Sequence, residues 1–74
     1  MLNIGIIGFG RIGKVHARSI QTRVEDACVL RVCDPFMNLE MEAEARKLGI
    51  MECGRDTEEL IHDPRLDAVL ICSS

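Results

Sequence analysis

Three glycines near the N-terminus have the spacing of a loop that binds phosphates. Gly8, Gly10 and Gly13 form a Gly-x-Gly-x-x-Gly pattern directly after an apolar run. In such a loop the first glycine permits a tight turn and the second lets a pyrophosphate approach the backbone, while the third lets a helix pack closely on a strand. Free N–H groups near Arg11 and Ile12 would then meet the phosphates at the positive end of the helix. The pattern predicts a dinucleotide site.

An acidic residue stands where a dinucleotide site needs one. Asp34 ends the next apolar segment and follows Gly13 at about the 20-residue spacing of dinucleotide-binding units. Its carboxylate can accept hydrogen bonds from both hydroxyls of an adenosine ribose. A 2′-phosphate would be repelled by the carboxylate, and the residues from Pro35 to Asn38 include no Arg or Lys to receive it. Asp34 therefore predicts NAD rather than NADP, and the alternative is a plain Asp-Pro turn.

The glycines also fit a second phosphate-binding pattern. The segment from Gly8 to Lys14 matches the opening of a P-loop, Gly-x-x-x-x-Gly-Lys. The next position should be Ser or Thr to hold magnesium, but it is Val15, which cannot ligate a metal. No Cys-x-x-Cys pair occurs, and the two histidines do not supply a zinc spacing. The sequence thus predicts neither a P-loop nor a metal site.

Short apolar segments alternate with helical patterns along the whole chain. In chain order we predict strand 2–7, helix 12–21, strand 28–33, helix 38–48, strand 50–53, a short helix ending near 62, and strand 68–72. Nearly continuous apolar strands alternating with helices are typical of a parallel sheet that is buried on both faces. Right-handed crossovers place the loop after each strand along one edge. The order β-α-β-α-β-α-β predicts a Rossmann-type parallel α/β sheet, partial, with about four strands.

Local signals within the helices give finer predictions. Four residues of the first helix should form one broad apolar face, Ile12, Val15, Ala17 and Ile20. Asn38 is expected to cap the second helix, and Gly49 to end it in the left-handed conformation. Asp56, with Glu59 three residues later, resembles a capping box for the third helix.

Two serines follow the last predicted strand. In open parallel sheets, ligands lie outside the carboxyl ends of the strands. We therefore expect Ser73 and Ser74 to line the cofactor cleft with hydroxyl groups, the alternative being an ordinary loop. Cys72 has no partner base in this chain and is predicted to be buried rather than catalytic.

Composition narrows the class of protein. The chain has 74 residues, of which 47% are hydrophobic and 28% charged, so a disordered segment is excluded. A net charge of −3 without a Lys/Arg stripe gives no support for nucleic-acid or membrane binding. The four cysteines are expected to be small core residues of a reduced, cytoplasmic protein. A chain this short buries only about 60% of its unfolded surface, which indicates part of a domain.

The motifs resemble a known enzyme family. Segment 4–16 is similar to the opening of the glucose–fructose oxidoreductase/inositol dehydrogenase family, as are Leu48-Gly49 and segment 59–73. The resemblance covers essentially the whole chain. It implies hydride transfer between a cyclitol or sugar hydroxyl and NAD or NADP. It also implies a cofactor lined by Gly8, Phe9, Gly10, Arg11, Ile12, Gly13, Asp34, Ser73 and Ser74.

The resemblance covers only the start of such enzymes. Family members are several times longer, and their catalytic lysine, in a Glu-Lys-Pro motif, and later Asp/His pair have no counterpart here. Residues 1–74 should thus be the N-terminal portion of a dinucleotide-binding domain, with the substrate domain elsewhere and no catalytic residue in this chain. The resemblance implies an NAD-dependent dehydrogenase that is a homo-oligomer at full length, and a chain that is inactive alone.

Two alternatives stay open at this point. The Gly-Phe-Gly-Arg-Ile-Gly segment and Asp34-Pro35-Phe36 also resemble glyceraldehyde-3-phosphate dehydrogenase, although that match fails between the second helix and the last strand. The chain could instead be a non-catalytic dinucleotide-binding module with a regulatory or redox-sensing role.

Overall fold

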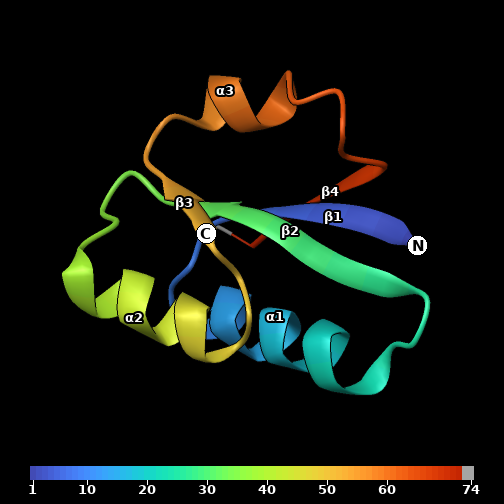
Figure 1. Cartoon of the computed structure of the whole chain (residues 1–74). Coiled ribbons are helices and arrows are strands. Elements are labelled where there is room, and N and C mark those ends of the chain that lie inside the picture. The colour runs from blue at the N-terminus through green and yellow to red at the C-terminus, as the bar shows by residue number, and fades with distance from the viewer. Residues whose placement is uncertain (73–74) are drawn as a thin grey trace.

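The apolar run at the N-terminus becomes an inner strand of a parallel sheet. Strand β1 (Leu2–Ile7) pairs with β2 (Ala27–Cys33) on one side and with β4 (Ala68–Ile71) on the other. Strand β3 (Glu52–Gly54) pairs with β2, so the order is β3-β2-β1-β4 (Figure 1). The computed structural model describes residues 1–72, and all pairings of these strands are parallel. The predicted Rossmann-type sheet is confirmed.

Helices cover both faces of this sheet. Helices α1 (Arg11–Arg23) and α2 (Leu39–Lys47) lie on one face, and α3 (Thr57–Ile61) lies on the other (Figure 1). The connections through α1 and α2 step from β1 towards β3, whereas the connection through α3 steps back across the sheet to β4. Because parallel crossovers are right-handed, this reversal of direction moves the third helix to the opposite face.

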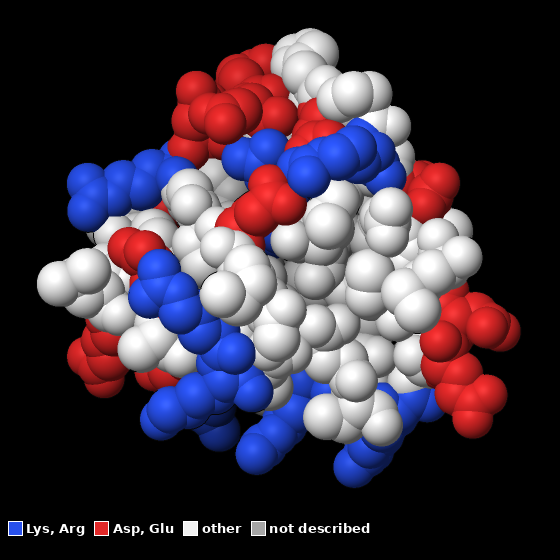
Figure 2. Space-filling view, in the orientation of Figure 1, with Lys and Arg blue, Asp and Glu red and all other residues white. Residues whose placement is uncertain are grey.

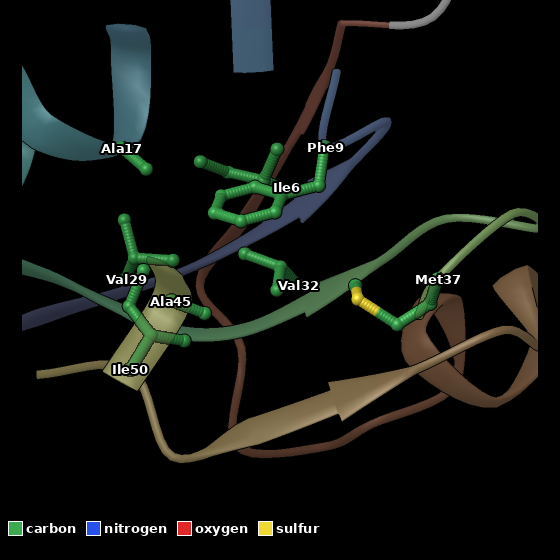
Figure 3. Close-up of a cluster of buried hydrophobic side chains, with 8 residues drawn as sticks. All are labelled: Ile6, Phe9, Ala17, Val29, Val32, Met37, Ala45 and Ile50. Carbon is green, nitrogen blue, oxygen red and sulfur yellow. The ribbon is translucent and has the colours of Figure 1, made fainter. Parts of the chain in front are cut away.

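The main core lies between the sheet and the α1–α2 layer. Figure 3 shows its eight buried side chains, Ile6, Phe9, Ala17, Val29, Val32, Met37, Ala45 and Ile50. A smaller cluster, formed by Ile7, Cys33 and Leu60, lies beneath α3. Phe9 is fully buried, so the second residue of the glycine loop anchors that loop in the core.

The helix ends agree with most of the local predictions. The Asn38 side chain accepts a hydrogen bond from the backbone of α2, and Gly49 has a φ of 85°. Asp56 caps α3 by accepting from the N–H of Glu59, but the Glu59 carboxylate pairs with Arg31, so only half of the predicted capping box forms. The third strand begins at Glu52, two residues late, because the residues before it complete the end of α2.

The predicted burial of the last strand is wrong, and part of the apolar face of α1 is exposed. Ile12 and Val15 are each 56% exposed, because the buried line of α1 runs through Gly13 and Ala17 instead. These two small residues are four apart and so lie on one side of the helix, where they let α1 approach the sheet closely. Strand β4 is largely exposed rather than buried, because within residues 1–72 it pairs with β1 alone, and α3 packs over β1 and β2.

Charge is unevenly distributed over the surface. Helix α1 carries four basic residues and no acidic one, Arg11, Lys14, Arg18 and Arg23. In Figure 2 blue side chains gather along the lower side of the view, where Figure 1 places α1 and α2. Among residues 1–72, no helix is long and apolar enough to cross a membrane.

Candidate cofactor site

A cavity of about 390 Å³ opens at the carboxyl edge of the sheet. Three separate segments line it, because β1, β2 and β4 all end at this edge. The lining residues are Gly8, Gly10, Arg11, Ile12, Asp34, Pro35, Phe36 and Cys72. The sequence pattern therefore brings the glycine loop and the acidic residue to one place.

Glycine is suited to each of the three loop positions for a different structural reason. Gly8 has a φ of 96°, a left-handed conformation that permits the turn out of β1. A methyl group on Gly13 would overlap the carbonyl oxygen of Gly8, so only glycine lets α1 start this close to the strand. A methyl group on Gly10 would meet no atom within 4 Å. Gly10 therefore leaves open the space through which a ligand can reach the backbone.

The start of α1 is suited to an anion. Its N-cap, Gly10, supplies no side-chain hydrogen bond, and the first turn contains no acidic residue. The first N–H groups of a helix have no partner within the helix, and they carry the positive end of its dipole. Arg11, the first residue of α1, lines the cavity and carries a positive charge. These features together favour a phosphate group at this end of α1.

Asp34 is a nearly buried carboxylate with two backbone donors. Its Oδ2 accepts from the N–H of Phe9 at 2.7 Å, and its Oδ1 accepts from the N–H of Phe36 at 2.8 Å. The side chain thus holds the phosphate loop and also forms the Asp-Pro turn, so the turn and the site coexist. A carboxylate has about four acceptor positions, which leaves capacity on both oxygens for ribose hydroxyls.

Some of the predicted site residues do not line the cavity. The side chain of Phe9 lies in the core, and Gly13 is buried beneath the loop, so both shape the cavity without lining it. Ser73 and Ser74 lie outside the described residues. Pro35 and Phe36 line the cavity without having been predicted as site residues, although their place just beyond a strand end could have indicated them.

Cys72 lines the cavity but is not poised for chemistry. Its N–H donates to the carbonyl of Ile7 at 2.7 Å, which extends the pairing beyond β4. Burial raises the pKa of its thiol, so the neutral form dominates near pH 7 and the nucleophilic thiolate is scarce. Burial likewise raises the pKa of Cys33 and Cys53. Within residues 1–72, no group of three His, Cys, Asp or Glu side chains could hold a metal ion.

The chain matches a family of known proteins. The profile of the oxidoreductase family with an NAD-binding Rossmann fold matches residues 2–74. The chain belongs to this family. The match confirms the resemblance to the glucose–fructose oxidoreductase/inositol dehydrogenase group. It therefore favours that group over glyceraldehyde-3-phosphate dehydrogenase.

Two relatives of this chain are named as inositol dehydrogenases. Myo-inositol 2-dehydrogenase of Thermotoga maritima is 41% identical over 73 residues, which are 99% of this chain and 21% of that protein. The scyllo-inositol 2-dehydrogenase (NAD(+)) of Bacillus subtilis is 39% identical over 66 residues, covering 89% of this chain and 19% of the relative.

The chain also resembles the solved structure of an inositol dehydrogenase. The scyllo-inositol dehydrogenase from Lactobacillus casei, with bound NAD(H) and scyllo-inositol, matches with a TM-score of 0.86 at 31% identity. That match covers 100% of this chain and 22% of the other. The chain therefore spans about a fifth of the length of the proteins it matches.

Proposed function

We propose that this chain binds the adenosine and pyrophosphate portion of NAD at the carboxyl edge of its sheet. The observation that carries the proposal is one cavity that joins the open side of Gly10 to the carboxylate of Asp34. In this arrangement the pyrophosphate lies on the backbone N–H groups from Gly10 to Ile12, and the adenosine ribose lies on Asp34. Membership of an NAD-binding family supports the same ligand.

The remaining predicted residues complete the site. Gly8 and Gly13 shape the loop, and the buried ring of Phe9 anchors it. The side chain of Arg11 supplies positive charge beside the pyrophosphate. Ser73 and Ser74 are proposed to add hydroxyl contacts after the last strand.

We further propose NAD as the preferred cofactor over NADP. Asp34 presents a carboxylate to the ribose, and Pro35 and Phe36, which line the cavity beside it, carry no positive charge. A 2′-phosphate at this position would meet like charge at short range, which disfavours binding. Titration with NADP in parallel with NAD tests this preference.

The reaction we propose is oxidation of a hydroxyl group of an inositol or a sugar. The names of the relatives support this class, as does the solved relative that holds NAD(H) with scyllo-inositol. When bound, the nicotinamide accepts or returns the hydride, whereas the protein supplies orientation and proton transfer. Residues 1–74 are proposed to be the N-terminal portion of the dinucleotide-binding domain. A separate substrate domain then supplies the proton-transfer groups, and the 74-residue chain alone does not turn over.

Two properties of the whole protein follow from the same resemblance. We propose a homo-oligomer at full length and a reduced, cytoplasmic location. The four cysteines are all free in the structure, which supports a reducing compartment.

Binding of NAD is best tested by titrating the ¹⁵N-labelled chain and following its backbone amide resonances. We expect the amides of Gly10, Arg11 and Ile12 to shift with NAD and to saturate, with a weaker response to NADP. If these amides stay unchanged at millimolar NAD, the proposed site is wrong.

The reaction needs a separate test on a family-length protein that contains residues 1–74. Reduction of NAD in the presence of an inositol or a sugar would support the dehydrogenase. Tight NAD binding without turnover on any cyclitol or sugar would instead identify a non-catalytic regulatory module.

A further inference from the structure

A second hollow, of about 240 Å³, is lined by residues of both α1 and α2. The lining residues are Phe9, Lys14, Arg18, Glu44, Lys47 and Leu48, and none of them lines the cavity at Asp34. Three of them are cations and one is a carboxylate. The hollow therefore has an excess of positive charge, although the chain as a whole has a formal net charge of −3.

Only one of these three cations has a carboxylate partner in the part of the chain that the structure describes. Nζ of Lys14 lies 2.9 Å from Oε2 of Glu44, and this ion pair joins α1 to α2. Arg18 and Lys47 form no ion pair within residues 1–72. Lys14 and Arg18 are four residues apart on α1, so their like charges are neighbours and repel each other. Two positive charges at the hollow are thus left without compensation.

Three carbonyl groups near the end of α2 have donors of their own. Those of Ala45 and Arg46 accept hydrogen bonds from backbone N–H groups that follow them. The carbonyl of Leu48 accepts from Nε2 of Gln21 at 2.9 Å. Lys47 is exposed, so its ammonium group is available to a ligand in the hollow.

The charge and the size of the hollow indicate which ligand fits it. Arginine offers a planar fork of N–H donors that suits a phosphate group, and lysine adds a compact positive charge. A phosphate monoester carries about 1.5 to 2 negative charges near pH 7, which matches the two free cations. The hollow is smaller than the usual ligand pocket of about 300–1,000 Å³, so it holds a phosphate group and few further atoms. Leu48 gives those atoms an apolar wall.

We propose that this hollow is an anion site, which holds the phosphate group of a small phosphate monoester between Arg18 and Lys47. The site is separate from the proposed cofactor site, and it does not depend on NAD being the cofactor. The two sites meet at the glycine loop, because Phe9 lines the hollow and its neighbours Gly8 and Gly10 line the cofactor cavity.

Phenyl phosphate is a suitable probe, because it joins a phosphate group to a compact apolar body. We expect it to shift the backbone amides of Arg18, Lys47 and Leu48 in the ¹⁵N-labelled chain. Saturating NAD should suppress the response of the Gly10 amide and leave the response at the hollow intact. Equal shifts with phenol, shifts confined to Gly10, or shifts at the hollow that NAD removes would each overturn the inference. A hollow that responds while Gly10 ignores NAD would refute the proposed function and leave the anion site standing.

Variants with opposite expected effects separate binding from damage to the fold. Arg18→Gln and Lys47→Gln should each raise the dissociation constant of phenyl phosphate by about 2- to 5-fold. Glu44→Gln should lower it, because the change removes a like charge and frees Lys14. Arg46→Gln is the matched control, since Arg46 is an exposed cation of α2 that does not line the hollow. Equal effects of Arg18→Gln and Arg46→Gln, or weaker binding in Glu44→Gln, would show that the hollow does not hold the phosphate.

Discussion

The backbone N–H of Phe9 donates a 2.7 Å hydrogen bond to Oδ2 of Asp34, two residues that are 25 positions apart in the chain. The bond is buried and joins the phosphate loop to the end of β2. The carboxylate that we propose for the ribose is thus also a structural part of the loop proposed for the pyrophosphate. Changes made at Asp34 to alter cofactor preference will therefore disturb the loop as well.

Asp34→Ala is expected to destabilise the fold and to abolish NAD binding. The N–H of Phe9 would be left buried without an acceptor, at a cost of about 1–3 kcal/mol, whereas the exposed Phe36 can turn its N–H to water. Asp34→Asn keeps one acceptor oxygen and should cost less. Urea unfolding of the three chains measures the difference. Identical midpoints for Asp34→Ala and the unaltered chain would show that the Phe9 bond contributes nothing.

The second and third glycines of the loop should respond in opposite ways to the same small change. Gly10→Ala meets open space, so we expect unaltered stability but a loss of NAD binding, because the methyl group occupies the phosphate approach. Gly13→Ala would overlap the carbonyl of Gly8, and overpacking of this kind costs about 1–3 kcal/mol. Thermal unfolding and NAD titration of both variants separate the two roles. Gly10→Ala that still binds NAD normally would place the phosphates elsewhere.

Bound NAD should protect one cysteine from alkylation. Cys72 lines the cavity, whereas Cys28 lies near the amino end of β2, among residues that line a different hollow. We expect saturating NAD to slow the reaction of Cys72 with iodoacetamide and to leave that of Cys28 unchanged. Mass spectrometry of the two labelled peptides gives both rates from one sample. Equal rates with and without NAD at Cys72 would contradict the position of the site.

An ion-pair network on the other side of the molecule should make stability depend on pH. The Arg65 guanidinium binds both oxygens of Glu52, at 3.0 and 2.7 Å, and also binds Asp63. These hydrogen bonds lower the pKa of Glu52 and of Asp63 below their ordinary values. Because protons then bind the unfolded chain more readily than the folded one, acid favours unfolding.

The stability of the fold should therefore decrease in acid. Stability should be constant above the ordinary carboxylate pKa values, roughly 4, and should fall as the pH drops below them. Arg65→Gln should reduce this fall, because it removes the largest cause of both pKa shifts, while Arg31 still lowers the pKa of Asp63 and of Glu52. Arg18→Gln is the control, since Arg18 makes no ion pair within residues 1–72. Urea midpoints between about pH 3 and pH 7 that run parallel for Arg65→Gln and Arg18→Gln would reject the role of Arg65.

The sequence predicted most of the framework because local signals were strong. The strands, the caps at Asn38 and Asp56 and the left-handed Gly49 follow from neighbouring residues alone. The exposure of Ile12 and Val15 could not be predicted in this way, because it depends on the small residues of α1 facing the sheet. Helical spacing alone indicates an apolar face but does not show which part of it the sheet covers.

The candidate site was likewise predictable from the sequence only in part. Its glycines and Asp34 stand out in the sequence by their residue types and their spacing. Two contacts could not be predicted from local patterns, because each joins residues that are separated in the chain. They are the hydrogen bond from Phe9 to Asp34 and the ion pair between Arg65 and Glu52. Phe36 was not predicted as a site residue, because nothing in its local sequence shows that it lines the cavity, which only the fold reveals.

The inner position of β1 has a consequence for the order in which the molecule assembles. Among residues 1–72, β1 is the first strand in chain order, and its two neighbours in the sheet are the second strand, β2, and the fourth, β4. Joining β1 to β4 brings together Asn3 and Asp67, which are 64 positions apart, so a long loop must close before this pairing forms. The β1–α1–β2 unit can form earlier from nearer contacts. We therefore expect the nucleotide cavity, which is lined by both Gly8 and Cys72, to form after the β1–α1–β2 unit.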